Sequence, residues 1–166
     1  MSEPGAIAFT DIVGFTEFTA TEGDRRALEV LDEQRRIVDE LMPADGRVVK
    51  ELGDGLLIWI DAAQSALAFS RDVQRAVRAA SMAGRGPLWI RIGLHWGEPA
   101  HRGSDLIGHD VNTAARIVDQ AGPGETLLSE ALAHRCDADQ AGVELRPIGP
   151  VHMKGLPTAI WLYRLA

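Results

Sequence analysis

Residues 46–60 read GRVVKELGDGLLIWI, and this stretch decides the fold. Two runs rich in β-branched and apolar residues, 46–52 and 56–60, stand on either side of Gly53-Asp54-Gly55. An Asp-Gly pair between two such runs is the strongest short-range signal for a β-hairpin. The stretch therefore predicts two antiparallel strands joined by a tight turn that contains Asp54.

The segments on either side of this hairpin alternate between strand and helix patterns. Around it we predict, in chain order, a strand over 6–10, a helix over 24–42, a helix over about 61–81 and a strand over 88–96. Pro43 ends the first helix, and Asp61 with Gln64 resembles a capping box at the start of the second. The order β-α-β-β-α-β is the ferredoxin-like arrangement, an antiparallel sheet with helices on one face.

The remaining third of the chain extends this core. We predict a loop over 97–109, a helix over about 110–121, a strand over 126–128, a short helix capped by Ser129 and ending at His134, and strands over 143–148 and 158–163. The expected fold class is α+β, with a ferredoxin-like, palm-like core and a C-terminal αβ extension. We expect a single domain over residues 1–166.

The composition limits the classes of protein that this chain can be. It has 24 acidic and 17 basic residues, a net charge of −7 and one cysteine, Cys136. The acidic balance argues against nucleic-acid binding, which needs lysines and arginines to neutralise phosphates. No apolar stretch is long enough to cross a bilayer, and no basic segment of a signal peptide precedes the first strand. We therefore expect a cytoplasmic protein that binds no membrane.

Two carboxylates are candidates for a metal site. Asp11 directly follows the first predicted strand, and Asp54 lies in the hairpin turn. Alone, each has a simpler interpretation, as a helix N-cap or turn residue for Asp11 and as a turn residue for Asp54. In the predicted fold the first strand and the hairpin are neighbours, so both carboxylates could meet. Two carboxylates with few histidines suit Mg²⁺ or Mn²⁺ rather than Zn²⁺.

Other polar residues are ambiguous when taken singly. Lys50 could be a solvated charge at a strand end, and Arg91, in an apolar strand, must face solvent or have a partner. Asn112 and Arg116 share one helix face, as they would on any surface helix. His95 is more typical of a buried histidine with partners than of a metal ligand. Phosphate-loop, dinucleotide-binding, zinc-protease and serine-hydrolase motifs are absent.

Taken together, these segments resemble the catalytic domain of class III nucleotidyl cyclases. The matching segments are FTDIVGFT (9–16), KELGDG (50–55), RIGLH (91–95), Asp105, VNTAAR (111–116) and KG (154–155). They occur in the order of that family and span nearly the whole chain. The resemblance implies an enzyme, and the compact form implies a bacterial catalytic unit that is either stand-alone or excised from a longer protein.

The resemblance also implies roles for individual residues. Asp11, Asp54 and the carbonyl of Ile12 would hold two divalent cations, Mg²⁺ or Mn²⁺, and the turn amides around Gly14 and Phe15 would lie near the phosphates. The reaction would be an in-line attack of the ribose 3′-hydroxyl on the α-phosphate, with pyrophosphate leaving.

The second half of the implied site binds the nucleotide. Arg116 would stabilise the charge of the transition state and Asn112 would orient the ribose, while Arg91 and Lys154 would bind the terminal phosphates. In the family the metal ligands come from one chain and the base-reading and transition-state residues from its partner. The resemblance thus implies a head-to-tail homodimer with two equivalent sites.

The choice of base follows from hydrogen-bonding chemistry once Lys50 and Asp105 are placed at the base. Adenine offers an acceptor at N1 and a donor at N6, and guanine reverses both. Lysine only donates and an ionised aspartate only accepts, so the pair matches adenine. The sequence therefore predicts an adenylyl cyclase that converts ATP to 3′,5′-cyclic AMP.

Two other functions are alternatives to an adenylyl cyclase. A non-catalytic, nucleotide-binding regulatory domain with a cyclase fold is the alternative from another class, although such domains normally lack residues that this chain retains. A diguanylate cyclase is a third possibility, but the sequence contains no GG[DE]EF hairpin.

Overall fold

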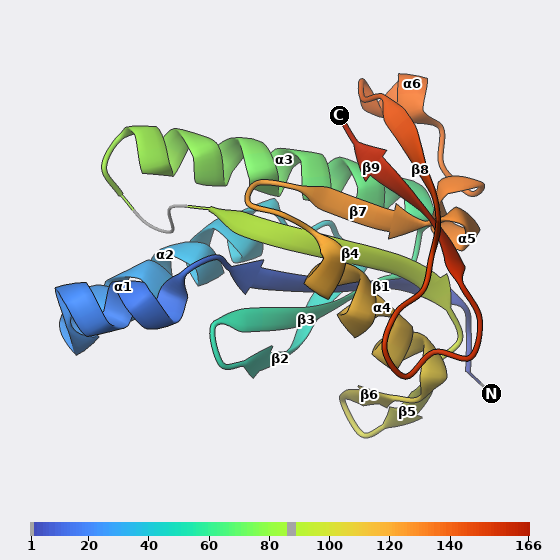
Figure 1. Cartoon of the computed structure of the whole chain (residues 1–166), viewed down its shortest axis with the longest axis horizontal. Coiled ribbons are helices and arrows are strands. Elements are labelled where there is room, and N and C mark those ends of the chain that lie inside the picture. Colours follow the sequence, from blue (N-terminus) through green and yellow to red (C-terminus); the bar gives the residue numbers. More distant parts are fainter. Residues whose placement is uncertain (1, 86–88) are drawn as a thin grey trace.

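A computed structural model describes residues 2–85 and 89–166 of the chain as one α+β unit (Figure 1). Its strands are β1 (Gly5–Ile12), β2 (Gly46–Leu52), β3 (Gly55–Ile60), β4 (Ile90–Gly97), β5 (Ala100–Arg102), β6 (Asp105–Ile107), β7 (Thr126–Ser129), β8 (Leu145–Val151) and β9 (Ile160–Leu165). Its helices are α1 (Phe15–Glu22), α2 (Asp24–Leu41), α3 (Ala63–Met82), α4 (His109–Gln120), α5 (Glu130–Ala133) and α6 (Ala138–Ala141).

The main sheet has the strand order β2-β3-β1-β4-β7-β9-β8. Its neighbouring strands are antiparallel except for β4 and β7, which run parallel. The predicted hairpin of β2 and β3 forms one edge and pairs with β1. Strands β1 and β4 lie side by side in the interior of this sheet, with β3 on one side and β7 on the other. Residues at the ends of β1 and β4 therefore lie near segments from both halves of the chain.

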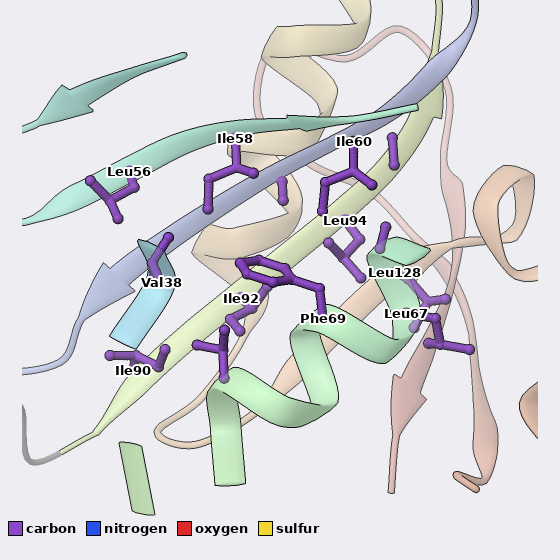
Figure 2. Packing of buried hydrophobic residues seen from close by; sticks show 14 of the residues in the cluster. Val38, Leu56, Ile58, Ile60, Leu67, Phe69, Ile90, Ile92, Leu94 and Leu128 are labelled. Atoms are coloured by element: carbon purple, nitrogen blue, oxygen red, sulfur yellow. The ribbon is translucent and has the colours of Figure 1, made fainter. Parts of the chain in front are cut away.

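Alternation along the strands divides the core between the two faces of this sheet. Even-numbered residues of β1 and β4, such as Ala8 and Ile92, pack with α2 and α3. Figure 2 shows this layer, with Phe69 of α3 beside Ile92. Odd-numbered residues of β1, such as Ile7 and Phe9, pack with α4. The two helices of the predicted βαββαβ core therefore share one face, as expected, and α4 from the extension covers the other.

Several local predictions were wrong. The chain forms α1 over residues 15–22, which were not predicted as a helix, and it forms the hairpin of β5 and β6 within 97–109, which were predicted as a loop. A short helix, α6, also precedes β8. The first residues of the strand predicted over 88–96 include Leu88, which lies outside the described residues.

The capping box predicted for α3 was wrong. The N-cap of α3 is Ala62, whose backbone amide donates to Asp45, while Gln64 donates to the carbonyl of Asp137. Ser129 is the N-cap residue of α5, as predicted, but its hydroxyl is bonded to His95 and makes no cap hydrogen bond. Long-range partners thus take up the side chains that the sequence pattern assigned to local caps.

No helix in the described part of the chain has the length and apolar character needed to span a membrane.

Candidate active site

Two acidic side chains meet where β1 ends and the β2–β3 hairpin turns. Asp11 lies near the end of β1, and Asp54 lies in the turn immediately before Gly55. A Cβ at Gly55 would come within 2.3 Å of the Thr10 carbonyl oxygen, so only glycine lets the turn approach β1 this closely. Burial raises the pKa of Asp54 to about 6, assisted by a hydrogen bond with Asp11 and the negative charge of Asp11.

Arg91 supplies the positive charge beside this pair. It lies opposite Asp11 in the antiparallel register of β1 and β4. Its Nε and Nη2 atoms donate to Oδ2 of Asp11 at 2.9 and 2.5 Å, and Nη1 donates to the Asp119 carbonyl at 3.4 Å. Of the two alternatives for a charge in an apolar strand, Arg91 therefore has partners. Its charge also lowers the pKa of Asp54, against the larger effect of burial.

A buried glutamine supports both carboxylates from α2. The Gln34 side chain is 2% exposed, its amide donates to the Asp54 carbonyl at 3.2 Å, and its oxygen lies 3.5 Å from the Thr10 hydroxyl. One side chain thus contacts the residue before Asp11 and the backbone of Asp54. Gln34 was not predicted as a site residue from the sequence, although it lies on the stripe of buried residues of α2 that includes Val30, Ile37 and Val38. A polar residue on such a stripe is the signal that could have identified it.

The donors at this point suit a hard divalent cation. Carboxylate and carbonyl oxygens are the ligands that Mg²⁺ and Mn²⁺ prefer, and Mg²⁺ is commonly held by one or two carboxylates together with substrate phosphates. Among the described residues no group of three or more His, Cys, Asp or Glu side chains could hold a metal. The negative charge of Asp11 raises the pKa of Asp54, and a bound cation would offset this repulsion.

The N-terminus of α1 lies just beyond Asp11. Gly14 is its N-cap, in the left-handed conformation with φ 71°, and its carbonyl accepts from the Phe18 amide. No side chain of the described residues caps this end, so the first-turn amides, beginning at Phe15, keep their donors available. Ile12, whose carbonyl is a predicted ligand, is buried in the last position of β1.

Lys50 and Asp105 form a second pair. The Lys50 Nζ atom lies 2.9 Å from Oδ1 and 3.0 Å from Oδ2 of Asp105. The ion pair with Lys50, followed by the backbone amide of Leu106, lowers the pKa of the Asp105 carboxyl. Asp105 is the first residue of β6, so the unpredicted hairpin delivers one partner of this pair.

A β-bulge directs Lys50 toward Asp105. Val48 lies opposite Ile58, which packs on the α3 side of the sheet, whereas Lys50 lies opposite Leu57, which packs on the α4 side. Strict alternation would have put Val48 and Lys50 on the same face, and the extra residue between them changes that. The sequence predicts the strand but not this irregularity.

The remaining candidates lie on or against α4. Asn112 is exposed. Arg116 has 43% of its side chain exposed, and its Nη1 atom lies 3.4 Å from Oδ2 of Asp119, one turn further along α4. Lys154 is exposed in the loop between β8 and β9, next to Met153, which packs in a cluster with Ile117 of α4. The fold therefore places Lys154 on the same side of the molecule as α4.

The candidates fall into two sets within one chain. Asp11, Asp54 and Arg91 are in direct contact at the end of β1. Lys50 and Asp105 contact one another, and across residues 2–85 and 89–166 no hydrogen bond or ion pair joins them to the first set. A cavity of about 190 Å³ lies between β1 and α4, lined by Asp11, Leu52 and Asp119 among others.

Comparisons with known proteins identify the family of this chain. The adenylate and guanylate cyclase catalytic-domain family matches residues 2–166. The chain is 30% identical to an uncharacterized protein of Mycobacterium tuberculosis over 96% of this chain and 40% of that protein. It is 26% identical to the putative adenylate cyclase 3 of Rhizobium meliloti over 95% of this chain and 28% of that protein.

The chain spans less than half the length of these curated relatives. Among solved structures, the adenylyl cyclase CyaB of Pseudomonas aeruginosa has the same fold, with a TM-score of 0.81 and 19% identity over 100% of this chain and 96% of that chain. The match across nearly all residues, together with the fold, shows that the chain belongs to the adenylate and guanylate cyclase catalytic-domain family.

Proposed function

We propose that this chain is an adenylyl cyclase that converts ATP to 3′,5′-cyclic AMP and pyrophosphate. The contact between Lys50 and Asp105 carries this proposal, because it puts one obligate donor and one obligate acceptor side by side. The Lys50 ammonium would donate to N1 of adenine, and the Asp105 carboxylate would accept from the N6 amine. With guanine, the Lys50 ammonium would face the N1–H donor and the Asp105 carboxylate would face the O6 acceptor. Polar groups left unpaired in this way discriminate strongly against the wrong substrate.

Asp11, Asp54 and the Ile12 carbonyl would hold two divalent cations. When bound, Mg²⁺ or Mn²⁺ would acidify the ribose 3′-hydroxyl and offset the charge of the phosphates. Gln34 keeps Asp54 in position by its bond to the Asp54 backbone.

The chain's own residues bind and orient the nucleotide. Arg91 and Lys154 would bind the terminal phosphates, and the first-turn amides of α1, after Gly14, would donate to phosphate oxygens. Asn112 would hold the ribose so that its 3′-oxygen lies in line with the bond that breaks, between the α-phosphorus and the oxygen leading to the β-phosphate. The 3′-hydroxyl loses its proton, the 3′-oxygen bonds to the α-phosphorus and pyrophosphate leaves.

Arg116 would stabilise the charge that develops as pyrophosphate leaves. Its side chain is 43% exposed, and within the described part of the chain its guanidinium pairs with the Asp119 carboxylate of its own helix, an exposed contact that it can leave to turn toward a phosphate.

We propose that a head-to-tail homodimer builds the complete site. On α4, Asn112 is exposed and Arg116 is partly exposed, with 43% of its side chain accessible. Leu52 and Ile107, on the same side of the sheet as Lys50 and Asp105, are apolar and 44% and 43% exposed. A partner chain that covers this side would bring its own Asp11 and Asp54 to Lys50, Asp105 and Arg116 of the first chain. ATP and a second copy of this chain are therefore the proposed partners.

The alternative is a regulatory domain that binds a nucleotide without turning it over. The Asp11→Ala variant distinguishes the two, with Glu51→Gln as a matched surface control because Glu51 is exposed and pairs with Arg35, away from the carboxylates of the site. A cyclase loses product formation in the Asp11→Ala variant and retains it in the control. Wild-type protein that binds ATP but forms no cyclic AMP with Mn²⁺ identifies the regulatory domain instead.

A further inference from the structure

A largely buried series of hydrogen bonds runs from β7 through β4 to Asp110 of α4, whose side chain is partly exposed. His95 Nδ1 lies 2.8 Å from the Ser129 hydroxyl, and His95 Nε2 lies 3.1 Å from Oδ1 of Asp110. The other carboxylate oxygen of Asp110 accepts from the Glu98 backbone amide at 2.8 Å. Ser129 is 1% exposed and His95 8% exposed. The three side chains link two strands to the first turn of the helix that carries Asn112 and Arg116.

The positions of the protons follow from the chemistry of the partners. A carboxylate only accepts, so His95 donates through Nε2–H to Asp110, and its Nδ1 accepts from the Ser129 hydroxyl. Burial lowers the pKa of His95, against the opposing effects of the hydrogen bond and charge of Asp110, and the neighbouring His109 lowers it further. With a neutral ring, both nitrogens of His95 and both carboxylate oxygens of Asp110 have hydrogen-bond partners.

A hydrolytic Ser-His-Asp site does not fit this geometry. The Ser129 hydroxyl is buried, and of the cavities identified in the described residues, the one nearest these hydrogen bonds is lined by Asp110 and Trp96 rather than by Ser129. No substrate carbonyl could reach the serine oxygen. The hydrogen bonds of Ser129, His95 and Asp110 therefore have a structural role, which is to connect β7, β4 and α4.

The bond from His95 to Asp110 lies where α4 packs directly against β4. A Cβ at Gly97 would be 2.3 Å from the carboxyl carbon of Asp110, and a Cβ at Gly93 would be 2.4 Å from the Val118 nitrogen. Gly93, His95 and Gly97 alternate onto the α4 face of the strand. The two glycines let the helix backbone lie against the strand, and the bond from His95 to Asp110 fixes where along the strand the first turn of α4 sits.

We propose that His95 and Asp110 are positioning residues that hold α4, and with it Asn112 and Arg116, in register with β4, which carries Arg91. Their effect on turnover rests on the proposed function, whereas their effect on the position of α4 does not. A loss of this bond would let the first turn of α4 shift, and a displacement of about 1 Å at a reacting group costs on the order of 100-fold in rate.

The test compares Asp110→Ala with Asp110→Asn. The alanine leaves both the His95 ring N–H and the Glu98 amide without an acceptor. The asparagine can accept from Glu98 with its oxygen and donate to His95 with its amide if the neutral ring moves its proton to Nδ1, which then donates to Ser129. The isosteric amide should therefore restore what the alanine loses.

We expect Asp110→Ala to lower kcat by about 10- to 100-fold while KM for ATP changes less than about threefold, because the Lys50–Asp105 pair lies outside α4. In the metal-free protein, hydrogen exchange at the α4 first-turn amides, including the Asn112 amide that donates to Gly108, should quicken while exchange at β1 and β3 stays unchanged. Asp110→Asn should return both quantities close to wild type.

If Asp110→Ala does not fold, His95→Leu serves as the second variant, because it keeps the buried volume and leaves Asp110 its bond to the Glu98 amide. The proposal is overturned if the folded variant keeps wild-type kcat, if its α4 amides exchange as in wild type, or if exchange quickens equally throughout the sheet. Failure of the proposed function is a separate outcome: wild-type protein then makes no cyclic AMP, and the exchange measurement alone decides whether α4 is held in this way.

Discussion

The ammonium group of Lys50 lies 2.9 Å from one carboxylate oxygen of Asp105 and 3.0 Å from the other, although the two residues stand 55 positions apart in the chain. The neighbouring Arg47 donates to the Ser104 carbonyl at 2.9 Å and so holds the same hairpin against β2. Both ends of the proposed base-reading pair are thus placed by one chain before any nucleotide binds.

Replacing both residues of this pair should remove the preference for ATP. In the Lys50→Glu/Asp105→Gly double variant, N1 and N6 of adenine lose both partners, and we expect kcat/KM for ATP to fall by about 100- to 10,000-fold. Initial rates with ATP and GTP measure the change, and Glu51→Gln, on the same strand, is the control. ATP kinetics unchanged in the double variant would refute the assignment of these residues to the base.

Replacing Asp54 should separate metal binding from stability. Asp54→Asn keeps the bond to Gln34, which uses the backbone carbonyl, but removes a charge from the metal site. We expect turnover to fall by at least about 100-fold, and Mn²⁺ binding, followed by calorimetry, to weaken markedly. Wild-type Mn²⁺ affinity in this variant would contradict the assigned ligand.

The same variant should be more stable than wild type in the absence of metal at neutral pH. The pKa of Asp54 is raised to about 6 in the folded chain, so the folded state binds more protons than the unfolded state between the ordinary value and pH 6. Stability therefore falls as the pH rises through this range, and the penalty is fully present above it. After allowance for screening by solvent, the free energy of unfolding of Asp54→Asn should exceed that of wild type by about 1 kcal/mol at pH 8 and should equal it at pH 3. Urea unfolding in the presence of EDTA measures both values.

His95 should give the opposite dependence on pH. Its pKa is lowered by burial, so the unfolded chain takes up a proton first as the pH falls below the ordinary value near 6.5. Stability is then fully present above that pH and is lost below it. His95→Leu should flatten this acid limb of a thermal-melting series, whereas the exposed His152→Gln should leave it in place. If His95→Leu still loses thermal stability as the pH falls below this value, other groups cause the loss.

Two inactive variants should restore one another if the site is shared between chains. The Arg116→Ala chain retains Asp11 and Asp54, and the Asp54→Asn chain retains Arg116. In a mixed dimer, one of the two sites therefore combines intact metal ligands from the first chain with an intact Arg116 from the second. With equal amounts and random exchange, half of the dimers are mixed and each has one of two sites, which predicts about a quarter of wild-type activity. A mixture no more active than the separate variants would contradict the shared site.

Elements with an apolar pattern could be predicted from the sequence, and those without one could not. The β2–β3 hairpin and helices α2 and α3 have the periodicity of buried faces, and the structure contains them within a few residues of their expected limits. By contrast, α1 buries none of its residues and β5 is exposed throughout, so neither has a stripe or alternation to detect. The β-bulge before Lys50 and the register that places Arg91 opposite Asp11 depend on pairing across the sheet, which no local pattern encodes.

Product formation from ATP and from GTP, measured with Mg²⁺ or Mn²⁺ across a dilution series of the protein, tests the proposed activity, base choice and shared site together. A homodimeric adenylyl cyclase should make cyclic AMP from ATP and little or no cyclic GMP from GTP, and its specific activity should fall on dilution as the dimer dissociates. Cyclic GMP as the main product would contradict the base reading by Lys50 and Asp105, and a specific activity independent of concentration down to the lowest dilution would contradict a site assembled from two weakly associated chains. No product under any condition would contradict the proposed activity itself.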